Sequence, residues 1–230
     1  MRHVVFLIIF LILPSIGWSA ARLPQRVVDS EYVIGNPKAE ATIYEYGALT
    51  CHVCLDFYLN VLPKLLQDKD FAGKIRIVIR PFPFSKLDVD GARIVLYSKD
   101  PHGLTKKLYE THEEWLKAPD QLEAIKKVAE KFGMSRDDIE ASLQDKHLEN
   151  AMLARRLIFK SDAAPIFKVG SSILPGLPHF EPFALVLKAF LDYRLQGHPE
   201  KEFDALKEFE RLAKEREKKE REQEKTNDKK

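Results

Sequence analysis

The sequence predicts an α/β fold in which a strand–helix–strand half and a hairpin–helix half flank a long helical insertion. Three observations indicate this arrangement. Apolar residues mark strands at 41–46 and 74–80, with a helix-period segment between them. No strand pattern occurs from about 87 to 160. Two short apolar runs, at 166–169 and 173–174, then enclose a Gly-Ser-Ser turn ahead of a last amphipathic segment.

The first 21 residues are expected to be a signal peptide. A short basic start precedes an apolar run that ends at residue 13, and Ser19-Ala20-Ala21 fits a small-x-small cleavage site. The run is shorter than the roughly 20 residues that span a bilayer, and Pro14 interrupts it. An uncleaved membrane anchor is the alternative. Either arrangement exposes the rest of the chain to an oxidising compartment, which is the periplasm if the source is Gram-negative.

Residues 22–199 are expected to form one domain, long enough to bury a substantial core. The net charge of +2 gives no reason to expect a nucleic-acid partner. From 200 to 230 the chain is mostly Glu, Lys and Arg, with both signs mixed. Four large apolar residues at a spacing of three predict a short amphipathic helix that frays into the solvated run 214–230. These residues are Phe203, Leu206, Phe209 and Leu212.

The first half of the domain is expected to be a βαβ unit. The strand at 41–46 leads into a helix whose apolar face includes Leu55, Leu59 and Leu62, and Pro63 should kink or restart that helix. The strand at 74–80 ends at a proline, Pro81. Because strand, helix and strand follow one another, the two strands should be parallel neighbours.

The second half and the insertion complete the predicted fold. Within the insertion, Trp115, Leu148, Met152 and Leu157 are expected to be core residues. The hairpin at 166–174 and a helix over 183–190 follow. A βαβ half, a helical insertion and a ββα half together make a thioredoxin fold interrupted by helices.

The chain has two cysteines, Cys51 and Cys54, and they lie at the junction between the first strand and its helix. A Cys-x-x-Cys pair in this position indicates a thiol–disulfide redox protein. A structural disulfide would close too small a loop to remove much unfolded-state entropy. A zinc site would need two further ligands, and no two of the seven histidines stand three to five residues apart. We therefore expect no metal and no cofactor, with copper handling or inert cysteines as the alternatives.

The two sulfurs are expected to have different roles. Cys51 should lie at the helix N-terminus, where unpaired N–H groups and the helix dipole favour the thiolate and lower the pKa of the thiol. This makes Cys51 the attacking nucleophile. Cys54, one turn later, becomes the resolving thiol.

Two polar residues are candidates for tuning this pair. Protonated His52 would add a positive charge beside Cys51; the alternative is an exposed His with little effect. Glu45 lies in the first strand, six residues before Cys51. Burial should raise the pKa of Glu45 and let it relay a proton to or from Cys54. The alternative is a Glu on the solvent face of the strand.

The segment 45–54, EYGALTCHVC, resembles the active-site segment of the DsbA-like thiol–disulfide oxidoreductases. The resemblance continues at 61–65 and 80–83, returns at 163–170, and covers roughly 31–195. It places Pro165 at the cis-proline position of that family, where the bond after Ala164 should be cis. The peptide groups of Ala164 would then pair with a bound substrate chain, so both residues are expected to bind substrate.

The resemblance implies a secreted dithiol oxidase that introduces disulfides into exported, reduced proteins and is reoxidised by a membrane redox partner. Two positions depart from the family: its oxidases commonly carry Pro-His between the cysteines, where this chain has His52-Val53, and Ala164 replaces a β-branched residue. A disulfide isomerase or reductase of the same fold is therefore the nearest alternative. A non-enzymatic module that binds unfolded chains or copper is the alternative from another class.

Overall fold

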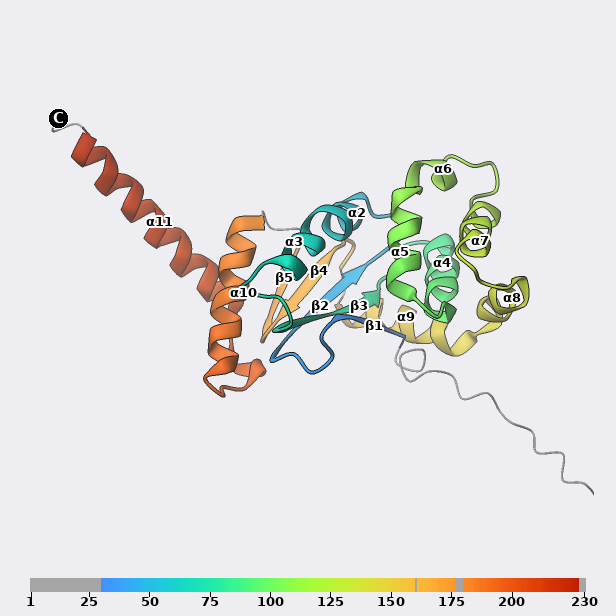
Figure 1. Ribbon diagram of the computed structural model, residues 1–230, viewed down its shortest axis with the longest axis horizontal. Helices are drawn as coiled ribbons and strands as arrows, with labels where there is room; N and C mark the ends of the chain where they lie inside the picture. Colours follow the sequence, from blue (N-terminus) through green and yellow to red (C-terminus); the bar gives the residue numbers. More distant parts are fainter. Residues whose placement is uncertain (1–29, 160, 177–179, 228–230) are drawn as a thin grey trace, which may run out of the picture.

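The computed structural model describes residues 30–159, 161–176 and 180–227, and it contains a five-stranded mixed sheet covered by helices (Figure 1). The strands are β1 (Tyr32–Gly35), β2 (Ala41–Gly47), β3 (Ile75–Pro81), β4 (Ile166–Val169) and β5 (Ser172–Pro175). Their order across the sheet is β1-β3-β2-β4-β5, so the strand that leads to the cysteines is the central one. The expected signal peptide lies outside the described residues.

The strand pairings confirm both halves of the predicted fold. β2 and β3 are parallel neighbours, with Glu45 opposite Ile79, as the βαβ expectation requires. β4 runs antiparallel to β2 and to β5, which makes the predicted hairpin. Pairing of β2 with both β3 and β4 buries the central strand and brings the two halves of the domain together.

The edge strand β1 was not predicted from the sequence. It pairs antiparallel with β3 and contributes the buried side chains of Tyr32 and Ile34, while Val33 between them is exposed. A run of four residues is too short to establish an alternating pattern, so its assignment needed the partner strand.

The crossover between β2 and β3 is a helix that is interrupted and then restarts. It consists of α2 (His52–Asp56), a π-helical turn η1 (Phe57–Val61) and α3 (Leu62–Gln67). Pro63 lies in the first turn of α3. A proline there has no N–H to donate and its ring clashes with the preceding turn, so the ladder of hydrogen bonds shifts just before it. The expected restart at Pro63 is confirmed.

Among its described residues the insertion consists of helices joined by short turns and contains no strand, which confirms the prediction. Its helices are α4 (Lys86–Tyr97), α5 (Pro101–Glu110), α6 (His112–Leu116), α7 (Gln121–Lys131), α8 (Arg136–Gln144) and α9 (Lys146–Phe159). Trp115, Leu148 and Met152 are fully buried, as expected. The expectation for Leu157 is wrong, because its side chain is 77% exposed. Leu157 follows Leu148 by about two and a half helical turns, so it lies on the opposite face of α9.

The chain after residue 199 is attached to the domain before it becomes solvated. Beyond α10 (Phe180–Leu195), the short turn η2 (Glu200–Glu202) places the Glu200 carboxylate 2.9 Å from the backbone N–H of Thr42, which donates to it. Phe203 is buried against Phe190 and Tyr193. The segment 200–203 therefore packs on the domain.

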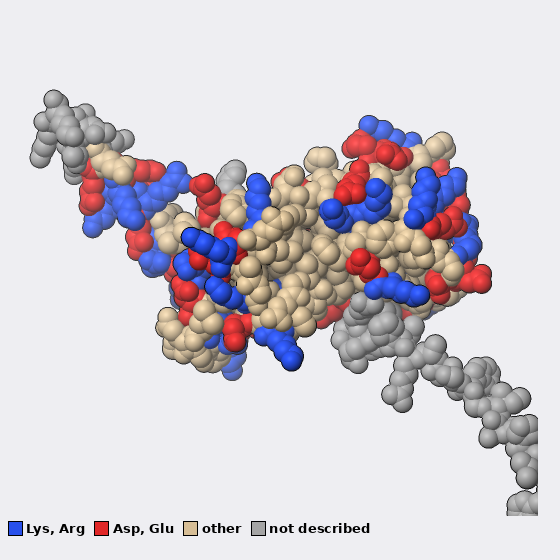
Figure 2. Space-filling view, in the orientation of Figure 1, with Lys and Arg blue, Asp and Glu red and all other residues tan. Residues whose placement is uncertain are grey.

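Helix α11 (Ala205–Asn227) is longer than the short helix that the sequence predicted. Phe209 and Leu212 pack against the core, and from residue 213 to 223 every side chain is exposed. Lys and Arg alternate with Glu along this part of the helix (Figure 2). Ion pairs four residues apart, such as Arg216–Glu220, explain why the helix continues without a core to pack on. Within the described part of the chain, no helix combines the length and the apolar character needed to cross a bilayer.

Removal of residues 214–230 should change the melting temperature by less than about 2 °C, because exposed ion pairs contribute little to stability. A truncation that begins at residue 203 is the contrasting variant. It also removes the buried ring of Phe203, and its melting temperature should fall by more than about 5 °C. Differential scanning calorimetry of the two proteins tests this, and a fall of several degrees in the shorter truncation would show that the exposed helix is a packed element.

Candidate active site

Cys51 and Cys54 are joined by a disulfide at the start of α2. Cys51 is the N-cap residue of that helix, and its sulfur accepts a hydrogen bond from the backbone N–H of Cys54 at 3.1 Å. The central strand β2 ends four residues earlier, so the strand and the helix together determine where the sulfurs lie. The sequence-based placement of Cys51 at a helix N-terminus is confirmed.

The two cysteines differ in their access to solvent. Cys54 is buried, with 1% of its surface exposed, whereas Cys51 is partly exposed. The neighbouring His52 and Val53 are also exposed. Cys51 is therefore the cysteine of the pair that is more accessible from solvent.

The loop before β4 lies against the disulfide. The Ala164–Pro165 peptide bond is cis, which confirms the expected conformation. The carbonyl oxygen of Ala164 lies 3.5 Å from the sulfur of Cys51. Ala164 is partly exposed and Pro165 is buried. The structure thus brings together residues that are more than 100 positions apart in the sequence.

Asp88 holds the loop in front of Cys51, a role that was not predicted from the sequence. Its buried carboxylate accepts hydrogen bonds from the backbone N–H groups of Thr50, Phe84 and Ser85 and from the hydroxyls of Thr50 and Ser85, at 2.9–3.1 Å. Ser85 and Asp88 form a capping box at the start of α4, and this Ser-x-x-Asp spacing was visible in the sequence. The contact with Thr50 was not, because it depends on the tertiary fold.

A second contact from the insertion holds the same loop. The hydroxyl of Tyr109, on α5, donates a hydrogen bond to the carbonyl oxygen of Ala48 at 3.1 Å. Both groups are buried. The residues that precede Cys51 are thus tied to the helical insertion through Asp88 and Tyr109.

Glu45 is buried, so the solvent-facing alternative for this residue is wrong. Glu45 lines a cavity together with residues of η1, α4 and α5, and 3% of the residue is exposed. Desolvation by burial raises the pKa of Glu45 to about 8. At neutral pH the carboxyl group is therefore mostly protonated.

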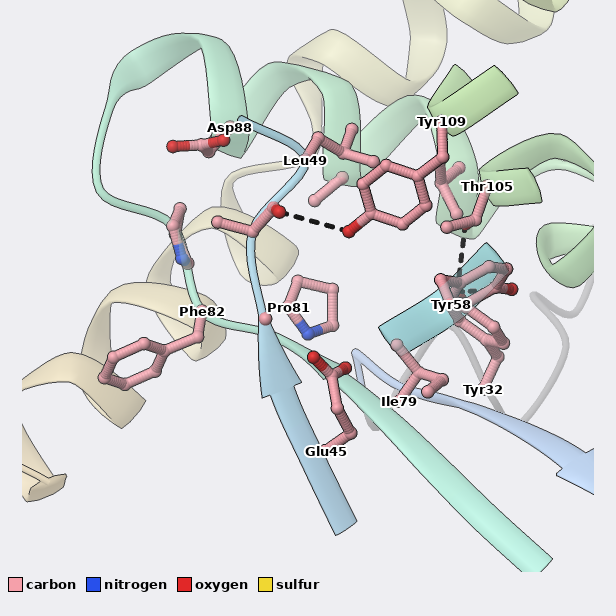
Figure 3. Close-up of a pocket in the computed structure, with 15 residues that line it drawn as sticks. Tyr32, Glu45, Leu49, Tyr58, Ile79, Pro81, Phe82, Asp88, Thr105 and Tyr109 are labelled. Carbon is pink, nitrogen blue, oxygen red and sulfur yellow. Dashed lines mark hydrogen bonds between the residues drawn. The ribbon is translucent and has the colours of Figure 1, made fainter. Parts of the chain in front are cut away.

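The carboxyl group of Glu45 faces a small cavity of about 30 Å³. Figure 3 shows it pointing toward Pro81, with Tyr109 across the cavity. A cavity of this size has room for a water molecule, which needs roughly 10–15 Å³ by this measure. Neither cysteine is among the described residues that line it.

His52 is exposed, and its ring lies 6.2 Å from the ring of His112 at the start of α6. Burial of His112 lowers the pKa of its imidazole. Glu113 is the next residue along α6. Among the residues that the structure describes, His52, His112 and Glu113 are the one group of three His, Cys, Asp or Glu residues whose ligand atoms lie close enough to share a metal ion. The scattered histidines of the sequence are therefore partly brought together by the fold.

A family model described as Thioredoxin matches residues 28–169 of the chain. A Rickettsia conorii protein, provisionally named a protein-disulfide oxidoreductase, is 22% identical over 138 residues, which are 59% of this chain and 50% of that protein. The chain thus spans about half the length of this curated relative.

Two solved structures share the fold. The crystal structure of Wolbachia pipientis alpha-DsbA1 superposes with a TM-score of 0.65 at 19% identity, covering 73% of this chain and 94% of that one. The structure of a protein-disulfide isomerase from Novosphingobium aromaticivorans gives a TM-score of 0.58 at 18% identity, covering 71% and 98%. At these identities the likeness concerns the fold.

Glu45→Gln should remove a pH dependence of stability. The usual pKa of about 4.5 applies to Glu45 in the unfolded chain and about 8 in the folded one. Between these values the unfolded chain releases the proton first, so the free energy of unfolding falls as pH rises. The loss is complete above about pH 8 and amounts to roughly 3–5 kcal/mol. The free energy of unfolding of the variant should lack this fall. The difference between variant and wild type should therefore shift in favour of the variant by about 3–5 kcal/mol between pH 5 and pH 8.

Urea unfolding of the disulfide-intact proteins at pH 5 and pH 8 measures this difference. Glu40→Gln is the matched control, because Glu40 is exposed and its replacement removes one carboxylate without changing the buried site. If both variants follow the same pH profile, Glu45 is ionised in the folded protein.

Proposed function

The chain belongs to the thioredoxin family, and on that premise we propose that it is an exported thiol–disulfide oxidoreductase that introduces disulfide bonds into other exported proteins. The observation that carries the proposal is the asymmetry of the disulfide. Cys51 caps helix α2 and is accessible, whereas Cys54 is buried. The DsbA-type fold and the name of the rickettsial relative support the same chemistry.

The reaction begins when a substrate thiolate attacks the sulfur of Cys51. The Cys51–Cys54 bond breaks, a mixed disulfide forms between the substrate and Cys51, and Cys54 leaves and takes up a proton. A second substrate thiolate then attacks the substrate sulfur of the mixed disulfide and releases Cys51 as a thiolate. The substrate loses two electrons and gains a disulfide, and the protein is left as a reduced dithiol.

The direction of transfer depends on how well the protein stabilises the departing Cys51 thiolate. The backbone N–H of Cys54 already points at this sulfur, and the N-terminus of α2 favours a negative charge. Stabilisation of the thiolate stabilises the reduced protein and makes the disulfide a stronger oxidant. This supports an oxidase over a reductase.

The substrate chain is proposed to lie along the backbone of Ala164. The carbonyl oxygen of this residue is 3.5 Å from the sulfur of Cys51 and can accept a hydrogen bond from an extended peptide. The exposed side chain of Val53 adds an apolar surface beside the sulfur. Unfolded, reduced chains offer both extended backbone and apolar side chains.

Glu45 is proposed to exchange a proton with Cys54 during the first step. A pKa of about 8 lets the group give up and regain a proton near neutral pH. Because the cavity beside Glu45 does not include Cys54 in its lining, this transfer needs a bridging water.

The proposed place of work is the periplasm or an equivalent oxidising compartment. The support is the basic, apolar and small-residue pattern of residues 1–21. A membrane redox partner would restore the Cys51–Cys54 disulfide after each turnover, as the DsbA resemblance implies. The structural neighbour from Novosphingobium aromaticivorans is described as a protein-disulfide isomerase, so an isomerase or reductase of the same fold is the alternative to be tested.

Cys51→Ser should abolish disulfide transfer, whereas Cys54→Ser should accumulate mixed disulfides with substrate. The reason is that Cys51 is accessible and Cys54 is buried. In each variant the remaining cysteine is first converted to a mixed disulfide with glutathione, which supplies the oxidising equivalent, and the protein is then incubated with a reduced, unfolded substrate. Attack by a substrate thiolate releases glutathione and leaves the trapped species, which non-reducing electrophoresis detects. Trapping through Cys54 in the Cys51→Ser protein would reverse the assigned roles.

The equilibrium with glutathione should place the reduction potential near the roughly −120 mV of DsbA and well above the roughly −270 mV of thioredoxin. The reason is the stabilisation of the Cys51 thiolate by the start of α2. Mass spectrometry of the protein equilibrated in glutathione buffers gives the oxidised fraction. A value near that of thioredoxin would favour the reductase alternative.

A further inference from the structure

Three potential metal ligands from two distant parts of the chain meet beside the candidate active site. His52 begins α2, directly after Cys51, and His112 and Glu113 begin α6 in the helical insertion. One ligand atom from each of the three side chains lies within 4.8 Å of the others. The two imidazole rings are 6.2 Å apart and inclined at 61°. Both helices lie on the same side of the molecule, at one end of α5 (Figure 1).

The buried, unpaired ring nitrogens of His112 indicate that a ligand binds here. The residue is 3% exposed, and neither of its ring nitrogens has a hydrogen-bond partner. The nearest carboxylate oxygen of Glu113 is 3.8 Å from Nδ1, too long for a hydrogen bond. A buried polar group without a partner costs about 1–3 kcal/mol.

Packing alone does not account for this imidazole. The ring makes an edge-on contact with Trp115, with centroids 4.9 Å apart. A phenylalanine or leucine would fill the same place without burying two unpaired nitrogens. A histidine at this position is therefore explained only if its ring nitrogens bind something. The adjacent imidazole of His52 and carboxylate of Glu113 indicate that this is a metal ion.

We propose that His52, His112 and Glu113 bind a divalent transition-metal ion of the Zn²⁺ class. Two imidazoles and one carboxylate are a ligand set that zinc uses, with the fourth position left to water or another ligand. Nitrogen and oxygen ligands on one tetrahedral zinc are separated by roughly 3.3–3.5 Å. The ligand atoms lie within 4.8 Å of one another, so each pair has to close by at most about 1.5 Å on binding. His112 is the fixed ligand, and the exposed side chains of His52 and Glu113 rotate toward it.

The competing interaction is weak. Glu113 forms an ion pair with Lys117 at 2.6 Å, and the two side chains are 61% and 76% exposed. Exposed pairs of this kind contribute about 0–1 kcal/mol. The carboxylate is thus available to a cation at little cost.

The site would join two parts of the fold. His52 belongs to the βαβ half that carries the disulfide, and the other two ligands belong to the insertion. A bound ion therefore cross-links the start of α2 to α6, and it should stabilise the folded chain by mass action. This inference goes beyond the proposed function, since it requires neither free thiols nor disulfide transfer.

The test is isothermal titration of Zn²⁺ into the full chain, without an affinity tag and with the Cys51–Cys54 disulfide intact, so that thiolates cannot bind the metal. The wild type should bind one Zn²⁺ per chain. His52→Ala and Glu113→Gln, which change exposed side chains, should each weaken binding by about tenfold or more. His147→Ala replaces an exposed histidine outside the cluster and should bind like the wild type.

Thermal unfolding is the second readout. Saturating Zn²⁺ should raise the melting temperature of the wild type and of His147→Ala, and it should leave that of His52→Ala and Glu113→Gln nearly unchanged. Either of two results overturns the proposal: no saturable binding up to about 1 mM Zn²⁺, or equal affinity in the wild type and in both ligand variants. Failure here would leave the trapping and glutathione experiments on the dithiol unaffected, so the two proposals are tested separately.

Discussion

The sulfur of Cys51 is held by the backbone of the helix that it begins. The backbone N–H of Cys54 donates this hydrogen bond to Sγ of Cys51. Cys51 is partly exposed, and Cys54, one turn further along, is buried. The arrangement requires a strand that ends just before the helix, which β2 provides from the centre of the sheet. It also requires that the loop between them keep its shape, because a small shift would move the sulfur away from the N–H.

Hydrogen bonds from the surrounding structure hold that loop in place. Asp88 accepts hydrogen bonds from both the backbone and the hydroxyl of Thr50, and Tyr109 binds the carbonyl of Ala48. Both come from the helical insertion, so the insertion supports the loop that precedes the dithiol. The loop before β4 supplies the opposite wall through the carbonyl of Ala164.

Two buried carboxyl groups near the site, Asp88 and Glu45, have different roles because their hydrogen-bond partners differ. Asp88 has hydrogen-bond donors on both carboxylate oxygens, which gives it a structural role in holding the loop. Glu45 lies between apolar side chains at a small cavity, and burial raises its pKa into the range useful for proton exchange. Two histidines differ in a similar way. The ring nitrogens of His112 are buried without hydrogen-bond partners, whereas Nδ1 of His102 is hydrogen-bonded to the hydroxyl of Tyr58 at 2.6 Å.

The sequence by itself determined the parts of this protein that depend on short-range patterns. Alternation and helical spacing were enough to predict the βαβ unit, the helical insertion and the hairpin. The position of Cys51 and Cys54 between a strand pattern and a helical pattern placed the dithiol at a helix start. Only the tertiary structure decided that β1 is a strand, that Leu157 faces solvent, that Asp88 holds Thr50, and that His52 meets His112 and Glu113. Those outcomes depend on contacts between residues far apart in the chain or on which face of a helix meets the core, and local periodicity carries no information about which distant side chains will be neighbours.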